Sequence, residues 1–158
     1  MKYLLSFLII FYTGAVYAIP ENIFLFRHSE KSEGKNPHLT TAGKQRALQL
    51  PTLIHQTETV TLYSTNYNRT VESASELAKH FAVEINIYDP RDLVAFKEQI
   101  LQQQGTVIVI GHSNTSVELA ALISELTVSK MLESEFSRYF LLQRKGKNYH
   151  LSDLRMNF

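Results

Sequence analysis

Two arginines and two histidines stand at positions from which they could do chemistry together. Arg27 and His28 directly follow the apolar run 23–26. Arg69 comes shortly after a β-rich segment, and His112 follows another after a single glycine. Guanidinium groups bind phosphate oxygens through two parallel hydrogen bonds and stay charged at any relevant pH. A neutral imidazole, with an ordinary pKa of about 6.5, is a nucleophile toward phosphorus. Together these side chains are suited to binding and transferring a phosphoryl group.

The segments that carry these residues alternate between two kinds of pattern. Short apolar or β-branched runs predict strands, and apolar residues at three- and four-residue spacing predict helices. The expected strands cover residues 22–27, 59–64, 83–88 and 106–110, and the expected helices cover 40–50, 70–81, 92–103 and 116–126, with a closing hairpin at 139–144 and 148–153. This alternation predicts an α/β layer fold with a mainly parallel central sheet.

The strand ends should bring the basic side chains together. Parallel strands share a direction, so their carboxyl ends meet at one edge of the sheet, where ligands bind in such folds. We therefore expect the two arginines and the two histidines to converge there, with His112 held protonated by a bound phosphate dianion. Ser113, Asn114 and Thr115 lie at the start of a helix, where free N–H groups favour an anion, so they are expected to bind phosphate as well.

The N-terminus has the pattern of an export signal. Lys2 precedes an apolar core at 3–12, and Val16, Tyr17 and Ala18 resemble a cleavage site. The apolar core is shorter than the roughly 20 residues that span a bilayer. We expect a signal peptide at 1–18, one domain at 19–158, and an exported protein, periplasmic or secreted, that has no stable membrane insertion after cleavage. The alternative is an uncleaved membrane anchor.

The composition excludes several classes of function. The 158 residues include 16 Lys and Arg against 15 Asp and Glu, and no basic stripe is visible, so nucleic acid is not expected as a partner. There is no cysteine, which excludes disulfides, thiolate catalysis and thiolate metal sites.

Four segments together resemble the histidine phosphatase superfamily, which has the phosphoglycerate-mutase-like fold. The segment 24–31 (FLFRHSEK) is similar to the Arg-His-Gly signature of that superfamily, with Ser29 in place of the glycine. The other three segments follow in the same order as in the superfamily: 38–47 (HLTTAGKQRA), 65–74 (TNYNRTVESA) and 107–115 (VIVIGHSNT). The resemblance extends from residue 23 to about residue 126 and implies a three-layer α/β/α sandwich.

The resemblance also implies roles for individual residues. His28 would be phosphorylated during turnover, and Arg27, Arg69 and His112 would complete the phosphate pocket. The function implied is hydrolysis of a phosphomonoester or phosphohistidine, on a small molecule or a phosphoprotein, without a metal or other cofactor.

The general acid is less well specified by the sequence. Many relatives in the superfamily that this chain resembles place a glutamate after the third strand, within a longer insertion, where this chain has Asp89. Asp89 is the expected acid because it follows that strand directly, and Asp92 and Glu30 are the other candidates.

Three other functions fit parts of the pattern. A phosphomutase of the same superfamily would use the same pocket, but the chain is short for the insertions that close over a sugar acid. A protein that binds a phosphorylated ligand without catalysis would also keep the basic residues. A metal site made by His28, His38 and His112 lacks a carboxylate at suitable spacing.

Overall fold

The computed structural model describes residues 19–55 and 59–158. The expected signal peptide at 1–18 lies outside the described residues. In the described part, strands form a six-stranded sheet in the order β3-β2-β4-β1-β5-β6. The strands are β1 (Asn22–Arg27), β2 (Val60–Ser64), β3 (Ile85–Ile87), β4 (Thr106–Gly111), β5 (Arg138–Lys145) and β6 (Asn148–Arg155). The first four are parallel to one another, and β5 and β6 form an antiparallel hairpin beside β1.

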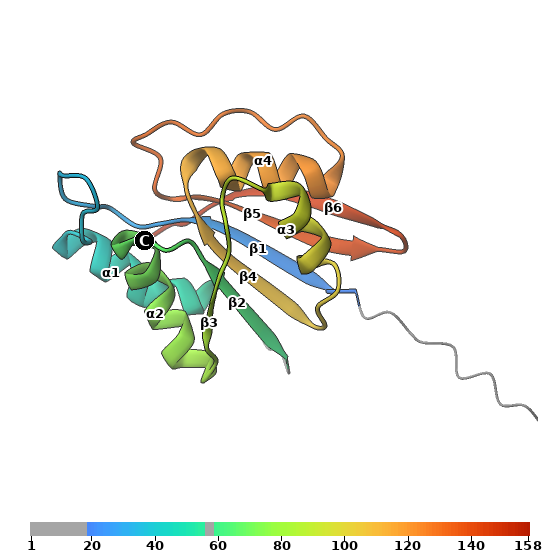
Figure 1. Ribbon diagram of the computed structural model, residues 1–158, viewed down its shortest axis with the longest axis horizontal. Coiled ribbons are helices and arrows are strands. Elements are labelled where there is room, and N and C mark those ends of the chain that lie inside the picture. Colours follow the sequence, from blue (N-terminus) through green and yellow to red (C-terminus); the bar gives the residue numbers. More distant parts are fainter. Residues whose placement is uncertain (1–18, 56–58) are drawn as a thin grey trace, which may run out of the picture.

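Helices cover both faces of the sheet (Figure 1), which confirms the expected three-layer α/β/α sandwich. They are α1 (Thr41–Gln49), the 3₁₀ turn η1 (Leu50–Leu53), α2 (Asn68–Phe81), α3 (Leu93–Ile100) and α4 (Ser113–Ser124). Residues of η1 and α2 belong to one hydrophobic cluster, with α1 packed against α2, and residues of α3 and α4 belong to the other. Across residues 19–55 and 59–158, no helix is both long and apolar enough to span a membrane.

The alternation of side chains along β1 divides the core into these two clusters. Ile23 and Leu25 share a cluster with residues of α3 and α4, and Phe24 and Phe26 share the other with residues of η1 and α2. All four side chains are buried because β1 is central in the sheet and has helices on both faces. An unbroken apolar run is the pattern that such a strand requires.

Most expected elements are confirmed, with shifted ends. Helix α4 begins at Ser113, three residues before the expected start, because the Thr115 hydroxyl accepts the backbone N–H of His112 and caps the first turn. Strand β3 spans only Ile85–Ile87 of the expected 83–88 and lies at the sheet edge. Helix α1 ends at Gln49, and Pro51 lies in the 3₁₀ turn η1 that follows it.

Gly43 fixes helix α1 against the segment that follows His28. A Cβ atom at Gly43 would lie 2.1 Å from the backbone oxygen of Glu30. The same oxygen accepts a hydrogen bond of 2.9 Å from the backbone N–H of Thr40, the residue that caps α1. The glycine of the segment 38–47 is therefore needed for close contact between backbones.

We predict that Gly43→Ala destabilises the protein by about 1–3 kcal/mol, the usual cost of overpacking. The direction of the change in stability tests the contact, because alanine at an unhindered helix position would stabilise the protein by about 1 kcal/mol relative to glycine. Urea denaturation followed by circular dichroism measures the change. Gln45→Ala, at an exposed position of the same helix, is the matched control. A Gly43→Ala protein as stable as the wild type would contradict the contact.

Candidate active site

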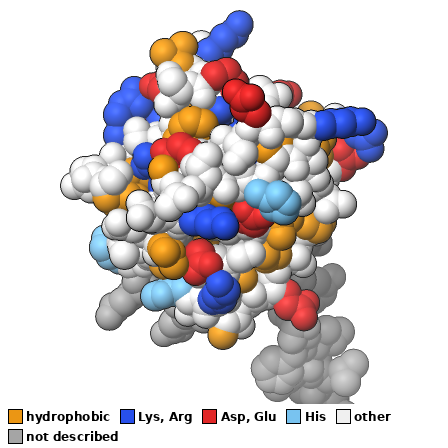
Figure 2. All heavy atoms as spheres, turned by 90° about the vertical axis from the view of Figure 1, so that its left-hand side faces the viewer, with side chains coloured by type: hydrophobic (Ala, Val, Ile, Leu, Met, Phe, Trp, Pro, Cys, Tyr) orange, Lys and Arg blue, Asp and Glu red, His pale blue; other side chains and the backbone are white. Residues whose placement is uncertain are grey.

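The pairing of β1 with β4 brings the two histidines together. Arg27 is opposite Gly111 at the last rung of the parallel ladder, and the backbone N–H of His28 donates to the Gly111 oxygen at 3.0 Å. The rings of His28 and His112 therefore lie next to each other in an edge-to-face arrangement, with centroids 5.6 Å apart. Strand β2 ends at Ser64 beside β4, which brings the segment that carries Arg69 to the same edge. Basic, acidic and histidine side chains are interspersed on this side of the molecule (Figure 2).

The hydrogen bond of His28 determines which of its ring nitrogens is free. Its Nδ1 lies 2.8 Å from the backbone oxygen of Ser29. A carbonyl oxygen can only accept, so Nδ1 carries the proton and the neutral ring has its lone pair on Nε2. Burial, together with the positive charge of Arg27, lowers the pKa of His28 to about 3. At neutral pH His28 is therefore an uncharged imidazole held in one tautomer.

A chain of hydrogen bonds sets the tautomer of His112 in the same way. Arg69 Nη2 lies 3.4 Å from His112 Nδ1, and because a guanidinium can only donate, Nδ1 accepts. His112 Nε2 then donates to Thr65 Oγ1 at 3.0 Å, and that hydroxyl donates to Thr70 Oγ1 at 2.9 Å. The Thr70 hydroxyl donates in turn to a backbone oxygen. Burial and the nearby Arg69 lower the pKa of His112 to about 4, so the ring is uncharged at neutral pH.

Both arginines keep a buried donor without a partner. The Nε atoms of Arg27 and Arg69 are buried and make no hydrogen bond in the structure, and neither does the Ser29 hydroxyl. Burial lowers the pKa of both guanidinium groups, because removal of a charge from water is unfavourable. An anion bound between them would satisfy the free donors and offset that cost.

Aromatic rings hold each guanidinium in place. The Cζ atom of Arg27 lies 4.2 Å from the ring centroid of Phe136, and that of Arg69 lies 4.6 Å from the ring centroid of Tyr67. Tyr67 also contacts His112 edge to face, with ring centroids 5.2 Å apart. Sequence reasoning did not single out either aromatic residue. Tyr67 was within a segment already quoted, but Phe136 lies in a connection with no recognisable pattern.

The three residues after His112 have different surroundings. The Ser113 hydroxyl donates to Glu133 Oε1 at 2.8 Å, at the rim of the pocket. Asn114 is exposed, and it lines a neighbouring groove with Ser113. The buried Thr115 hydroxyl caps α4 and would lie 2.7 Å from a Cβ at Gly111. Thr115 therefore supports the backbone around His112, and only Ser113 has its hydroxyl next to a partner of Arg27.

Asp89 does not have the surroundings of a proton donor. Its carboxylate is paired with Arg91, whose Nη2 lies 2.6 Å from Asp89 Oδ2 and whose Nε lies 2.9 Å from Oδ1. The hydrogen bonds from Arg91 lower the pKa of Asp89 to about 2. The expected acid is therefore ionised above that pH and holds no proton to donate.

The other two acidic candidates also have structural partners. Asp92 caps helix α3 by accepting the backbone N–H of Ala95 at 3.0 Å. Glu30 accepts from Nε and Nη2 of Arg46 at 2.7 to 3.0 Å. Neither carboxylate has a hydrogen bond with the arginines or histidines of the pocket in the described part of the chain.

Glu133 is the carboxylate that sequence reasoning missed. Its Oε2 accepts from Arg27 Nη2 at 3.0 Å, while Arg27 Nη1 donates to the backbone oxygen of Leu132 at 2.9 Å. Glu133 belongs to the connection between α4 and β5, which carries neither periodicity nor a motif. The sequence contains no signal that would have identified it.

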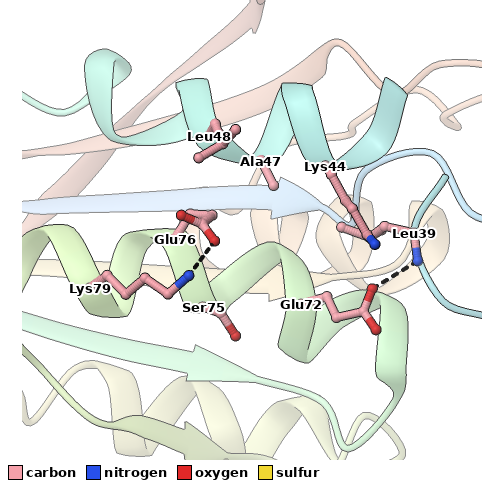
Figure 3. A pocket seen from close by; sticks show the side chains of 8 residues that line it. All are labelled: Leu39, Lys44, Ala47, Leu48, Glu72, Ser75, Glu76 and Lys79. Carbon is pink, nitrogen blue, oxygen red and sulfur yellow. Dashed lines mark hydrogen bonds and ion pairs between the residues drawn. The ribbon is translucent and has the colours of Figure 1, made fainter. Parts of the chain in front are cut away.

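A second hollow lies between α1 and α2 (Figure 3). Three of its charged side chains have partners: Lys79 Nζ donates to Glu76 at 2.7 Å, and Glu72 accepts the backbone N–H of Leu39 at 2.9 Å. Glu72 also pairs with His38. His38 therefore lies with α2 rather than with the other two histidines, and the described residues contain no group of three potential metal ligands.

Comparisons with known proteins give a match in fold without a match in sequence. No family model and no curated protein matches the chain. Several solved structures do, at 10% to 17% sequence identity.

Three of these structures are phosphatases by name. A protein from Agrobacterium tumefaciens, proposed to be the phosphohistidine phosphatase SixA, has a TM-score of 0.63 and 17% identity, over 87% of this chain and 99% of that chain. Mycobacterial glucosyl-3-phosphoglycerate phosphatase with inorganic phosphate has a TM-score of 0.62 and 11% identity, over 87% and 97%. The protein histidine phosphatase SixA complexed with tungstate has a TM-score of 0.63 and 15% identity, over 85% and 96%. The chain has the fold of these phosphatases. The expected phosphoglycerate-mutase-like architecture is thereby confirmed.

We predict that the buried histidines make the protein less stable as the pH falls from about 7 to 5. The unfolded chain takes up a proton at His28 near pH 6.5, but the folded protein does so only near pH 3. The unfolded state therefore binds more protons in this window, and the loss at about pH 5 is roughly 2 kcal/mol per buried histidine. Urea denaturation of His28→Asn should show a smaller difference between the two pH values than the wild type does.

The control for this measurement is His150→Asn, an exposed position on β6. This variant should keep the pH dependence of the wild type. An equal loss of stability in wild type and His28→Asn would contradict the lowered pKa of His28.

Proposed function

We propose that this protein is a phosphatase that hydrolyses phosphomonoesters or phosphohistidine through a phosphohistidine intermediate on His28. One observation carries the proposal. The Nδ1–H of His28 is fixed by the Ser29 oxygen, which leaves the Nε2 lone pair free beside two guanidinium groups that keep unpartnered donors. A nucleophile of this kind next to buried positive charge is suited to attack on a phosphoryl group.

The residues of the pocket support two successive displacements. His28 Nε2 forms a bond to phosphorus while the bond from phosphorus to the leaving oxygen breaks, and water then displaces the phosphoryl group from Nε2. The guanidinium groups of Arg27 and Arg69 bind the oxygens of the transferring group in both steps. Because a bound dianion raises the proton affinity of a nearby imidazole, His112 becomes a charged donor to the same group.

The comparisons support hydrolysis over the alternatives. The similar structures include a phosphatase with inorganic phosphate and another with tungstate, an anion that resembles phosphate. A phosphomutase would need the intermediate to return its phosphoryl group to a second substrate position, and no observation on this chain favours that. A protein that only binds phosphate would not need a nucleophile held in one tautomer.

We predict that His28→Ala abolishes turnover of p-nitrophenyl phosphate while leaving the fold intact. The nucleophile is lost, but the arginines remain. Rapid-quench labelling of the wild type with a radioactive phosphomonoester should give an acid-labile, base-stable phosphate on His28. His150→Ala, at an exposed site, should retain full activity. Label on a hydroxyl side chain, or activity in His28→Ala, would refute the mechanism.

We also predict that Arg69→Lys lowers kcat/KM by about ten- to a hundred-fold. Lysine keeps the charge but loses the planar pair of donors, and a hydrogen bond to a charged group is worth about 1.5–3 kcal/mol. Vanadate inhibition should weaken to a similar extent, since vanadate would occupy the same donors. Arg144→Lys, on the exposed end of β5, is the control. If Arg69→Lys retains both wild-type values, Arg69 does not bind the phosphoryl group.

A further inference from the structure

The connection between α4 and β5 brings one carboxylate into contact with the phosphate pocket. Glu133 Oε2 accepts from Arg27 Nη2 at 3.0 Å, and Oε1 accepts from Ser113 Oγ at 2.8 Å. Its negative charge also acts on the rings of His28 and His112. Of the acidic side chains in the described residues, this is the one with a hydrogen bond to an arginine of the pocket.

The backbone on either side of Glu133 is anchored. Leu132 donates its backbone N–H to Glu135 Oε2 at 2.7 Å, and its oxygen accepts from Arg27 Nη1 at 2.9 Å. Glu135 is itself held by Arg155, whose Nη2 lies 3.0 Å from Glu135 Oε1. The Glu133 side chain is 82% exposed, so its carboxylate can exchange its partners for a substrate without disrupting the core.

We propose that Glu133 is the general acid and base of the reaction, protonating the leaving oxygen in the first step and taking a proton from water in the second. This inference rests on the proposed phosphatase function. It gives Glu133 the role for which Asp89, Asp92 and Glu30 are unsuited, because each of those carboxylates is committed to an arginine or a helix cap away from the pocket.

The position of Glu133 fits the path of the leaving group. Ser113 and Glu133 also line a groove of about 410 Å³ that runs along α4, with Val117 and Met131 among its apolar residues. Glu133 therefore stands between the pocket, where the phosphoryl group would bind, and a space that can hold the remainder of the substrate. The oxygen that joins these two parts of the substrate would lie at the carboxylate.

Substrate binding supplies the proton that the acid needs. The hydrogen bond from Ser113 and the charge of Arg27 lower the pKa of Glu133, so its carboxyl group is ionised at neutral pH before the substrate binds. A phosphate group at Arg27 takes over the guanidinium donors and adds negative charge next to the carboxylate. Both changes favour its protonated form. Phosphomonoesters lose their second proton near pH 6, so the incoming monoanion can deliver this proton itself.

The proton and bonding changes balance over the two steps. In the first, the bond between His28 Nε2 and phosphorus forms, the bond from phosphorus to the leaving oxygen breaks, and the Glu133 proton passes to that oxygen. In the second, a water oxygen bonds to phosphorus, the bond to Nε2 breaks, and the water proton passes to the Glu133 carboxylate. The Glu133 carboxyl group is then protonated, as it was at the start of the first step. This proton leaves with the product phosphate as its monoanion, which returns the carboxylate to its ionised resting form.

The test compares Glu133→Gln with wild type on two substrates that differ in their need for an acid. Phenolate is a poorer leaving group than p-nitrophenolate, so phenyl phosphate depends on protonation more strongly. Rapid-quench kinetics should show phosphorylation of His28 by phenyl phosphate slowed about 10²–10⁴-fold, the usual contribution of a general acid. The burst of p-nitrophenolate should remain nearly as fast as in the wild type, followed by slow turnover as phosphohistidine accumulates for lack of a base.

A matched control and a binding measurement separate chemistry from positioning. Glu118→Gln removes the same charge from the same groove at an exposed site and should behave as wild type. Glu133→Gln should bind vanadate at least as tightly as wild type, because the carboxylate no longer competes for Arg27. Equal slowing of His28 phosphorylation by both substrates, or weaker vanadate binding, would show that Glu133 only positions Arg27 and would overturn the proposal. No slowing of either substrate would overturn it as well.

The same experiment distinguishes failure of this inference from failure of the proposed function. If the wild type shows neither turnover of the two substrates nor label on His28, the phosphatase assignment fails. If the wild type forms phosphohistidine and Glu133→Gln matches it in both steps, only the role of Glu133 fails.

Discussion

The final rung of pairing between β1 and β4 is the constraint on which the site depends. It sets Arg27 opposite Gly111 and lets the next backbone N–H, that of His28, donate to the Gly111 oxygen. A slip of one residue would turn Arg27 to the other face of the sheet and separate the histidine rings. The register is strongly specified because both strands are buried on both faces by apolar side chains.

The pocket formed in this way has more buried positive charge than the surrounding side chains neutralise. Arg27 is only 2% exposed, and the negative charge it contacts is on Glu133 at the surface. Both histidines are neutral at neutral pH, because burial and the neighbouring arginines lower their pKa values. The same charges that keep His28 neutral also favour an anion in front of it. One electrostatic arrangement thus supports both nucleophilicity and phosphate binding.

The assignment of Asp89 as the general acid shows where prediction from the sequence was inaccurate. Asp89 follows the third strand directly, but Arg91 is only two residues away, and a bidentate pair between them needs no tertiary structure to form. Thr115 is similar: its position after His112 favoured an anion-binding role, but its hydroxyl satisfies the backbone of its own turn. In both cases a residue close in the sequence occupies the side chain that was expected to act on the phosphoryl group.

The sequence by itself determined the layer fold, the parallel strands and the convergence of Arg27, His28, Arg69 and His112 at one sheet edge. These follow from periodicity and from the shared direction of parallel strands, which are local or topological properties. Only the tertiary structure decided the tautomers of the histidines, the aromatic rings behind the arginines and the contact of Glu133 with Arg27. The contact of Arg27 with Glu133 joins residues 106 positions apart through a connection without periodicity. The geometry of these contacts depends on how the chain packs around the pocket, which no local pattern encodes.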